Sequence, residues 1–178
     1  MNRLTFIIPL GGFLVIALIA GWTLFGMLDG QRSDNQLPSA LLNKSAPSTI
    51  LPSLDGEPID ISQFKGQAIM VNYFASWCAP CRAEAPALAL LSKRIKIVGI
   101  AYKDRHEDTL KFLTEYGNPF SGIMVDNDGM AAISWGVYGV PETFILDEDG
   151  KVLLRHAGPV TRAVLDKDIE KVLKGLGL

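Results

Sequence analysis

The chain begins with one long apolar run and continues with short stretches in which apolar and polar residues alternate or recur at helical spacing. From Leu4 to Leu28 there is no charged residue. A helix of that length would extend about 37 Å, whereas the hydrocarbon core of a bilayer is about 30 Å thick. The run therefore predicts a transmembrane anchor over residues 1–28, with the lipid bilayer as the partner of residues 4–28.

Two other interpretations fit the length and pattern of this run less well. A cleaved signal peptide has an apolar region of only about 7–15 residues, followed by a small-x-small cleavage site that this sequence lacks. A buried core helix would normally carry a polar face. The Lys and Arg residues on the two sides are nearly balanced, so charge favours a cytoplasmic N-terminus only slightly.

The remaining sequence predicts a linker and one domain. Residues 29–45 are polar and aperiodic, which is typical of a linker, and residues 46–178 suffice for one domain. Apolar β-branched stretches predict strands, and helical spacing predicts helices. The expected strands are 69–74, 95–101, 123–125, 143–146 and 152–154, and the expected helices are 80–93, 104–116, 129–135 and one that begins at Thr161.

Several local signals refine this order of elements. Asp55-Gly56 predicts a hairpin, and the segment 147–150 predicts a second one. Asp104 and Glu107 have the spacing of a capping box. The order of strands and helices predicts an α/β fold with a central mixed β-sheet flanked by helices on both faces.

Composition narrows the candidate chemistry. The net charge is −2 and there is no lysine or arginine block, so nucleic acid is not an expected partner. The chain has 2 cysteines, Cys78 and Cys81, too few for a framework of structural disulfides. The cysteine usage therefore points to one reactive dithiol.

The run Trp77-Cys78-Ala79-Pro80-Cys81 lies between a predicted strand and a predicted helix. At a helix N-terminus the unpaired N–H groups and the helix dipole favour a thiolate. Cys78 is therefore the expected attacking and exposed sulfur. Cys81 follows one turn later, where it can resolve a mixed disulfide, and Trp77 is expected to cover one side of the pair.

Metal sites are weaker interpretations of the same residues. A zinc site would need Cys78, Cys81, His106 and His156, but the two histidines lack metal-ligand spacing. The segment 126–129 is similar to the start of a calcium loop, but it lacks the later ligands and the closing glutamate, so a turn is expected. The sequence predicts no metal and no cofactor.

The chain resembles the thioredoxin superfamily. The resemblance rests on the segment 77–81, on Pro86, and on Val140-Pro141, where that family keeps a cis-proline. More narrowly, the chain is similar to the CcmG/DsbE proteins of cytochrome c maturation, and the similarity covers nearly the whole chain. The segments that carry this narrower similarity are 81–84, 102–104, 117–119, 126–130, 136–144 and 155–158.

The resemblance implies a thiol-disulfide reductase, single-pass in the inner membrane, with its catalytic domain in the periplasm. Such a protein keeps the haem-attachment cysteines of apocytochrome c reduced, directly or through a partner thiol protein. A membrane electron carrier of the DsbD/CcdA kind would re-reduce it. The resemblance further implies that Pro141 belongs to the catalytic site and that Trp77 and Val140 contact the substrate.

One position departs from thioredoxin. Thioredoxin has a buried aspartate six residues before its first cysteine, where this chain has Asn72, which cannot take up a proton. Glu142 first and Glu84 second are the candidate replacements, with surface carboxylates as the alternative interpretation.

Three other functions stay open at this point. One is a general extracytoplasmic disulfide reductase or oxidase, because the sequence does not give the reduction potential. Another is a thiol peroxidase, because residues 46–66 resemble the segment that precedes the motif in such enzymes. The third is a tethered module that binds cysteine-containing segments without turnover.

Overall fold

The structure is a computed structural model that describes residues 4–28 and 40–178. These residues fall into two units, and the predicted linker residues 29–39 lie outside the described part of the chain. The first unit contains helix α1 (Leu4–Leu28), whose described side chains, such as Phe13 and Trp22, are exposed. Within the described residues, no helix meets the length and apolarity that crossing a membrane requires. The predicted anchor is therefore not established by the structure.

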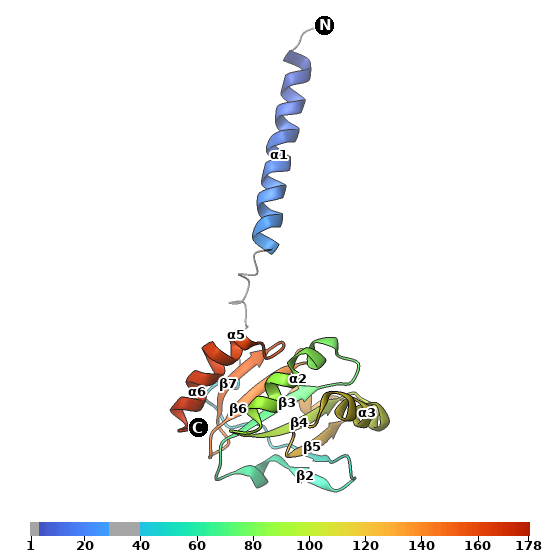
Figure 1. The fold of residues 1–178 in the computed structure, drawn as a ribbon, viewed down its shortest axis with the longest axis vertical. Helices are drawn as coiled ribbons and strands as arrows, with labels where there is room; N and C mark the ends of the chain where they lie inside the picture. Colours follow the sequence, from blue (N-terminus) through green and yellow to red (C-terminus); the bar gives the residue numbers. More distant parts are fainter. Residues whose placement is uncertain (1–3, 29–39) are drawn as a thin grey trace. The chain divides into compact units, whose positions relative to one another are not determined.

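The second unit is an α/β domain (Figure 1). Its strands are β1 (Ile50–Pro52), β2 (Pro58–Asp60), β3 (Ile69–Phe74), β4 (Lys96–Tyr102), β5 (Gly122–Asp126), β6 (Glu142–Leu146) and β7 (Val152–Ala157). Its α-helices are α2 (Ala79–Leu91), α3 (His106–Tyr116), α4 (Met130–Ser134), α5 (Arg162–Val164) and α6 (Glu170–Gly175). A 3₁₀ turn η1 (Ile61–Phe64) precedes β3, and a π turn η2 (Leu165–Ile169) joins α5 to α6.

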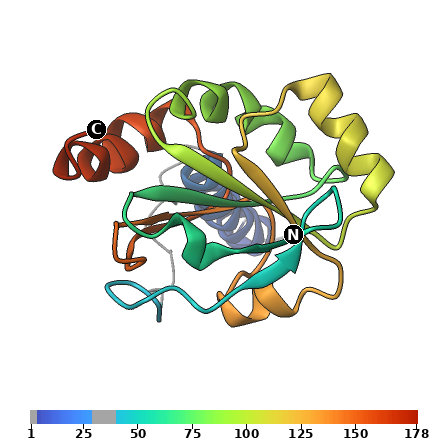
Figure 2. The same cartoon turned by 90° about the horizontal axis from the view of Figure 1, so that it is seen from below.

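The central sheet has the strand order β5-β4-β3-β6-β7 (Figure 2). Strands β3, β4 and β5 run parallel, whereas β6 pairs antiparallel with β3 and with β7. The predicted mixed sheet is therefore confirmed. The short β1–β2 pair forms a separate hairpin, and Gly56 at its turn has φ +90°, a conformation that glycine adopts without strain.

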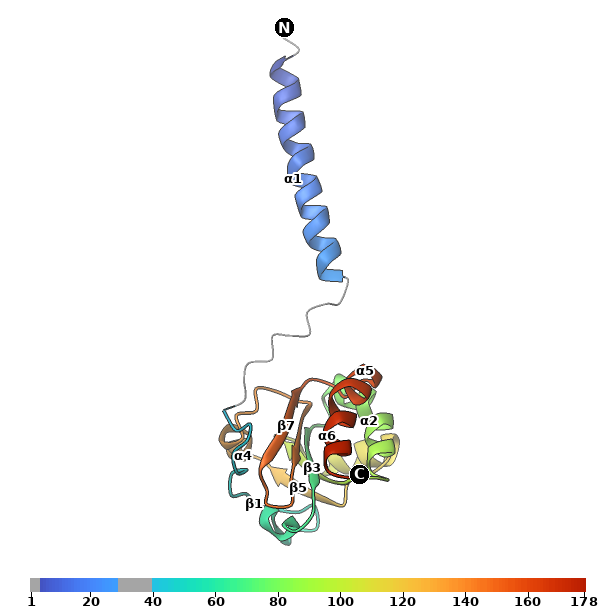
Figure 3. The ribbon, with the colours of Figure 1, turned by 90° about the vertical axis from the view of Figure 1, so that its left-hand side faces the viewer.

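Helices cover both faces of this sheet, as the sequence predicts (Figure 3). Helices α2, α3 and α6 pack on one face, and α4 and η1 pack on the other. All six residues of β3 are buried because the strand lies in the middle of the sheet between the two helical layers. The end of β3 therefore places the residues that follow it at the junction with α2.

Backbone hydrogen bonds join part of the predicted linker to the domain, so the folded domain begins before residue 46. The amide of Asn43 donates to the Val152 carbonyl at 2.8 Å, and that of Ala46 donates to the Gly150 carbonyl at 2.8 Å. Polar composition suggests a linker here, but backbone groups pair independently of side-chain polarity.

Candidate active site

Cys78 lies between the end of β3 and the start of α2, as the motif predicts. It is the N-cap residue of α2, and its Sγ accepts a hydrogen bond from the Cys81 amide at 3.1 Å. The two cysteines form a disulfide with their Cα atoms 5.3 Å apart, so the structure shows the oxidised protein. Reduction would place a thiolate on Cys78 where the first-turn amides of α2 can stabilise it.

Solvent exposure does not distinguish the two sulfurs. Cys78 is 3% exposed and Cys81 is 2% exposed, so the prediction that Cys78 is the exposed sulfur is wrong. The Val140 carbonyl oxygen lies 3.4 Å from Cys78 Sγ and covers it from a segment far away in the sequence. The surroundings do differ, because Cys81 instead lines a small internal cavity together with Glu84.

Val140 and Pro141 lie beside the disulfide, where the resemblance places them. The peptide bond between them is cis. Pro141 is buried and Val140 is half-buried. The disulfide sulfur carries no proton, but a reduced Cys78 thiol could donate its proton to the Val140 carbonyl.

Asp104 fixes the segment that precedes the dithiol. Its carboxylate accepts hydrogen bonds from the Ser76 amide at 2.8 Å, from Ser76 Oγ at 2.7 Å and from Thr109 Oγ1 at 2.8 Å. The indole of Trp77, 56% exposed, donates to the neighbouring Lys103 carbonyl at 3.3 Å. The loop between β4 and α3 therefore positions Ser76 and Trp77, the two residues that precede Cys78.

This arrangement corrects the prediction of a capping box at the start of α3. The helix begins after Arg105 without a side-chain cap, and Glu107 is exposed near the Arg105 guanidinium at 3.5 Å. The Asp104 carboxylate is turned toward the active-site loop instead. Spacing along the sequence could not show this, because Ser76 is 28 positions away from Asp104.

Glu84 is buried on α2 beside Asn72. Asn72 Nδ2 donates to Glu84 Oε1 at 3.0 Å, and the Val160 amide donates to Oε2 at 2.9 Å. Burial raises the pKa of Glu84 to about 7, and these two hydrogen bonds oppose that rise only in part. Glu84 is thus a carboxyl group that can gain or lose a proton near neutral pH next to Cys81.

Glu142 is also buried, but it lies on the other side of the sheet. Glu142 pairs with Tyr73 between β6 and β3, one position along from the pair formed by Asn72 and Thr143. Because successive strand residues point to opposite faces of a sheet, Glu142 lies on the face opposite to Asn72. Its carboxylate forms an ion pair with Arg155 and accepts a hydrogen bond from the Tyr138 amide at 3.1 Å. Glu142 is not among the residues that line the cavity beside Cys81.

Arg155 extends this ion pair into the loop before Pro141. It donates to the Gly136 carbonyl at 2.6 Å, and its guanidinium carbon lies 4.7 Å from the centre of the exposed Tyr138 ring. Glu142 and Arg155 therefore hold the loop that carries Val140. The segment 155–158 contributed to the resemblance, but no pattern in the sequence assigns this role to Arg155.

A zinc site would require the side chains of Cys78, Cys81, His106 and His156 to lie around one metal ion. His106 begins α3, whereas His156 lies in β7 with Nε2 3.2 Å from the Pro159 carbonyl oxygen. Over residues 4–28 and 40–178, no group of three or more His, Cys, Asp or Glu side chains is arranged to hold a metal ion.

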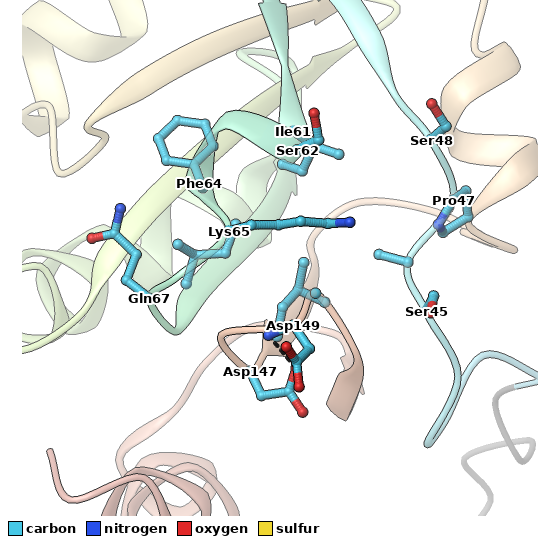
Figure 4. A pocket seen from close by; sticks show the side chains of 14 residues that line it. Ser45, Pro47, Ser48, Ile61, Ser62, Phe64, Lys65, Gln67, Asp147 and Asp149 are labelled. Atoms are coloured by element: carbon cyan, nitrogen blue, oxygen red, sulfur yellow. Dashed lines mark hydrogen bonds between the residues drawn. The ribbon is translucent and has the colours of Figure 1, made fainter.

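A larger hollow of about 180 Å³ lies at the other end of the sheet. It is lined by the beginning of β3 and the end of β6, whereas Cys78 follows the end of β3. Figure 4 shows the Lys65 side chain extending across it toward Pro47, with Asp147 and Asp149 on one side. The residues described around this hollow include no cysteine or histidine, so it is separate from the dithiol chemistry.

Comparison with known proteins agrees with this geometry. The redoxin family model matches residues 41–173. HelX, a thiol:disulfide interchange protein of Rhodobacter capsulatus, is 40% identical over 167 residues, which are 92% of this chain and 95% of HelX. DsbE, the thiol:disulfide interchange protein of Escherichia coli K12, is 39% identical over 175 residues, which are 96% of this chain and 94% of DsbE.

Solved structures share the fold of the domain. A Chlorobium tepidum protein that carries the DsbE name has a TM-score of 0.61 and 28% identity, and the match covers 75% of this chain and 94% of that one. A secreted disulfide oxidoreductase of Mycobacterium tuberculosis has a TM-score of 0.62 at 23% identity, covering 72% of this chain and 96% of that one. The second likeness is one of fold alone.

Proposed function

Because the chain belongs to the redoxin family and, within it, to the DsbE group of thiol:disulfide interchange proteins, we propose that this oxidoreductase is a reductant in cytochrome c maturation. It would keep the haem-attachment cysteines of apocytochrome c reduced, directly or through a partner thiol protein. The observation that carries the proposal is the Cys78–Cys81 disulfide at the α2 N-terminus, with a buried carboxyl group, Glu84, beside its second sulfur.

The proposed reaction starts from the reduced protein. The Cys78 thiolate attacks one sulfur of a substrate disulfide, forms a Cys78–substrate bond and releases the other substrate sulfur as a thiolate. Cys81 then loses its proton and attacks Cys78 Sγ, which breaks the Cys78–substrate bond. The substrate gains two electrons, and Cys78 and Cys81 are left in the disulfide that the structure shows.

The surface around the disulfide suits an extended cysteine-containing segment. The Val140 backbone lies next to Cys78, and extended peptides pair readily with exposed main-chain groups. The Trp77 indole is 56% exposed on the segment before Cys78. Trp77, Val140 and Pro141 would therefore contact the substrate, as the resemblance implies.

The two carboxylates take different roles in this proposal. Glu84 replaces Glu142 as the first candidate for the group that accepts the Cys81 proton, because it lines the same cavity as Cys81. Glu142, held by Arg155 on the opposite face, positions the loop that carries Val140. A carboxylate beside Cys81 also disfavours a thiolate, which suits a reductant.

Replacing Glu84 with glutamine should change how stability depends on pH. The pKa of Glu84 is about 7 in the folded protein and 4.5 in its ordinary state. Its stabilising contribution is therefore complete below about pH 4.5 and is lost as pH rises through about 7. Relative to Glu84→Gln, the oxidised wild type should lose on the order of 3 kcal/mol of unfolding free energy across that window.

Urea denaturation of both oxidised proteins between pH 4 and pH 8 measures this difference. The exposed Glu57→Gln is the matched control, and its curve should run parallel to that of the wild type. A Glu84→Gln curve that also runs parallel to that of the wild type would contradict a Glu84 pKa of about 7 in the folded protein.

The proposal also includes the location of the protein. The uncharged apolar run from Leu4 to Leu28 in the sequence would anchor it in the inner membrane, with residues 40–178 in the periplasm and a membrane electron carrier of the DsbD/CcdA kind as the source of electrons. Fusions of compartment-specific reporters to Leu178 test this arrangement. Activity only from the reporter that works outside the cytoplasm is expected, and activity only from the cytoplasmic reporter would contradict it.

A substrate assay tests the proposed reaction. The reduced chain is mixed with an oxidised Cys-x-x-Cys-His peptide, with an unrelated disulfide peptide of equal charge, or with hydrogen peroxide. We expect fastest reduction of the first peptide. Equal rates with both peptides would support a general disulfide reductase, and faster reaction with peroxide would support a thiol peroxidase.

A further inference from the structure

Lys103 has an unusual backbone conformation directly after the end of β4. Its φ is +45°, in the left-handed region that residues other than glycine rarely adopt. A side chain in this region costs free energy, and such residues persist where the surrounding structure holds them, often at functional sites. Lys103 also precedes Asp104, whose carboxylate holds the segment before the dithiol. The contacts of Lys103 supply a reason for its conformation.

The amide and the carbonyl of Lys103 bond to opposite sides of β4. The amide donates to the Asp126 carbonyl at the end of β5 at 2.9 Å, and the carbonyl accepts from the Trp77 indole, after β3, at 3.3 Å. Strand β4 lies between β3 and β5 in the sheet. The N–H and C=O of one residue in a regular strand point toward the same neighbouring strand, so an extended Lys103 could not form both bonds.

The Lys103 side chain packs against the turn between β5 and α4. Its Nζ lies 5.4 Å from the centre of the Tyr102 ring. Gly129 leaves room for the aliphatic part, since a Cβ at that position would collide with Lys103 Cε. The backbone carbonyl of Lys103, rather than its ammonium group, is therefore the group that bonds to Trp77.

The Trp77 indole needs such a contact to keep one orientation. It is 56% exposed on the residue before Cys78, and its N–H is the only hydrogen-bond donor of the side chain. A side chain that is ordered only when a ligand binds loses rotamer freedom at that moment, which weakens binding. An indole already held by Lys103 avoids this loss.

We propose that Lys103 is a positioning residue, which orients the Trp77 indole through its backbone carbonyl so that the ring forms a fixed surface beside Cys78. The inference rests on the proposed contact between Trp77 and the substrate segment. The left-handed conformation of Lys103 carries this role, and its charge does not. A residue that tolerates the same conformation should therefore replace Lys103, and a residue that resists it should not.

Two substitutions separate the conformation from the charge. Lys103→Asn removes the ammonium group but favours the left-handed region, in which asparagine is several-fold enriched. Lys103→Val removes the ammonium group and resists that region, because valine is branched at Cβ. Lys96→Val is the matched control, because it makes the same change at an exposed position at the other end of β4.

The first measurement is the second-order rate constant with which the reduced protein attacks a disulfide peptide. Lys103→Val should lower it by about fivefold, the factor for one weakened interface side chain, whereas Lys103→Asn and Lys96→Val should match the wild type. The loss should appear as a higher half-saturating peptide concentration with an unchanged maximal rate, since Trp77 takes no part in the bond changes. Equal slowing in Lys103→Asn and Lys103→Val would overturn the role of the backbone.

A double-mutant cycle shows whether Lys103 acts through Trp77. In a Trp77→Ala background, Lys103→Val should cause no further loss. A further fivefold loss in that background would overturn the inference. Slow attack by Trp77→Ala with wild-type attack by Lys103→Val would overturn the role of Lys103 and leave the Trp77 contact intact. Wild-type attack by Trp77→Ala would overturn the contact and the role of Lys103 together.

Hydrogen exchange of the Trp77 indole N–H tests the same bond without substrate or turnover. The signal is followed by ¹⁵N NMR and assigned with Trp77→Phe. In the wild type and Lys103→Asn, exchange should be about fivefold slower than in free tryptophan, the factor for one ordinary hydrogen bond. Exchange as fast as in free tryptophan would overturn the inference even if Lys103→Val does not fold. A wild type that reduces no disulfide peptide would contradict the proposed function, and indole exchange would still decide the role of Lys103.

Discussion

Cys81→Ser should accumulate mixed disulfides between Cys78 and substrate thiols, whereas Cys78→Ser should accumulate none. Cys78 is the N-cap residue of α2, where a thiolate is stabilised, and its sulfur is the one beside the Val140 backbone. Cys81 faces the internal cavity with Glu84, so without Cys78 it offers no sulfur to an incoming segment. Both substitutions should abolish steady-state disulfide exchange.

Non-reducing electrophoresis after acid quenching measures the trapped species. Ala83→Ser, an exposed position on the same helix, is the matched control and should behave as the wild type. Because the two sulfurs are almost equally buried, the experiment decides between them where exposure cannot. Equal trapping by the two cysteine variants would contradict the assignment of attacking and resolving roles.

Glu142→Ala should lower the unfolding free energy by about 3–5 kcal/mol, the typical cost of removing one partner from a buried ion pair. The Arg155 side chain is 8% exposed, so its charge would be left without compensation in a region that excludes water. The Tyr138 amide would lose its acceptor at the same time. The loop that carries Val140 should loosen, and exchange by the remaining folded protein should slow.

Urea denaturation of the oxidised proteins measures the stability change. Glu142→Leu combined with Arg155→Leu should recover most of the loss, since it removes the unpaired charge together with its partner. Glu57→Ala, at an exposed position, should change stability by less than about 0.5 kcal/mol. A loss of that small size in Glu142→Ala would show that the ion pair does not hold the loop.

The sequence predicted the dithiol and the sheet because their signals are local. The strand at Ile69–Phe74 is apolar except for Asn72, and the two cysteines stand at a strand-to-helix junction that neighbouring residues define. The position of each glutamate depended on long-range geometry instead. Whether Glu142 points toward α2 or away from it depends on the register of β6 against β3, which pairs Glu142 with Tyr73.

Two other differences between prediction and structure have the same origin. Cys78 was expected to be exposed, but the Val140 carbonyl, 62 positions along the chain, covers its sulfur. Asp104 was expected to cap its own helix, but it accepts hydrogen bonds from Ser76 in the loop before the dithiol. Both contacts join loops at the ends of strands that are neighbours only in the folded sheet, so patterns within a short window could not show them.

The reduction potential of the Cys78–Cys81 pair is the most direct test of the proposed reductant. It is measured by equilibrating the chain with buffers of reduced and oxidised glutathione at pH 7 and quantifying the disulfide. We expect a potential more negative than about −180 mV, on the reducing side of protein disulfide isomerase. A potential of about −120 mV, the value of the strong oxidant DsbA, would contradict the proposed role as a reductant.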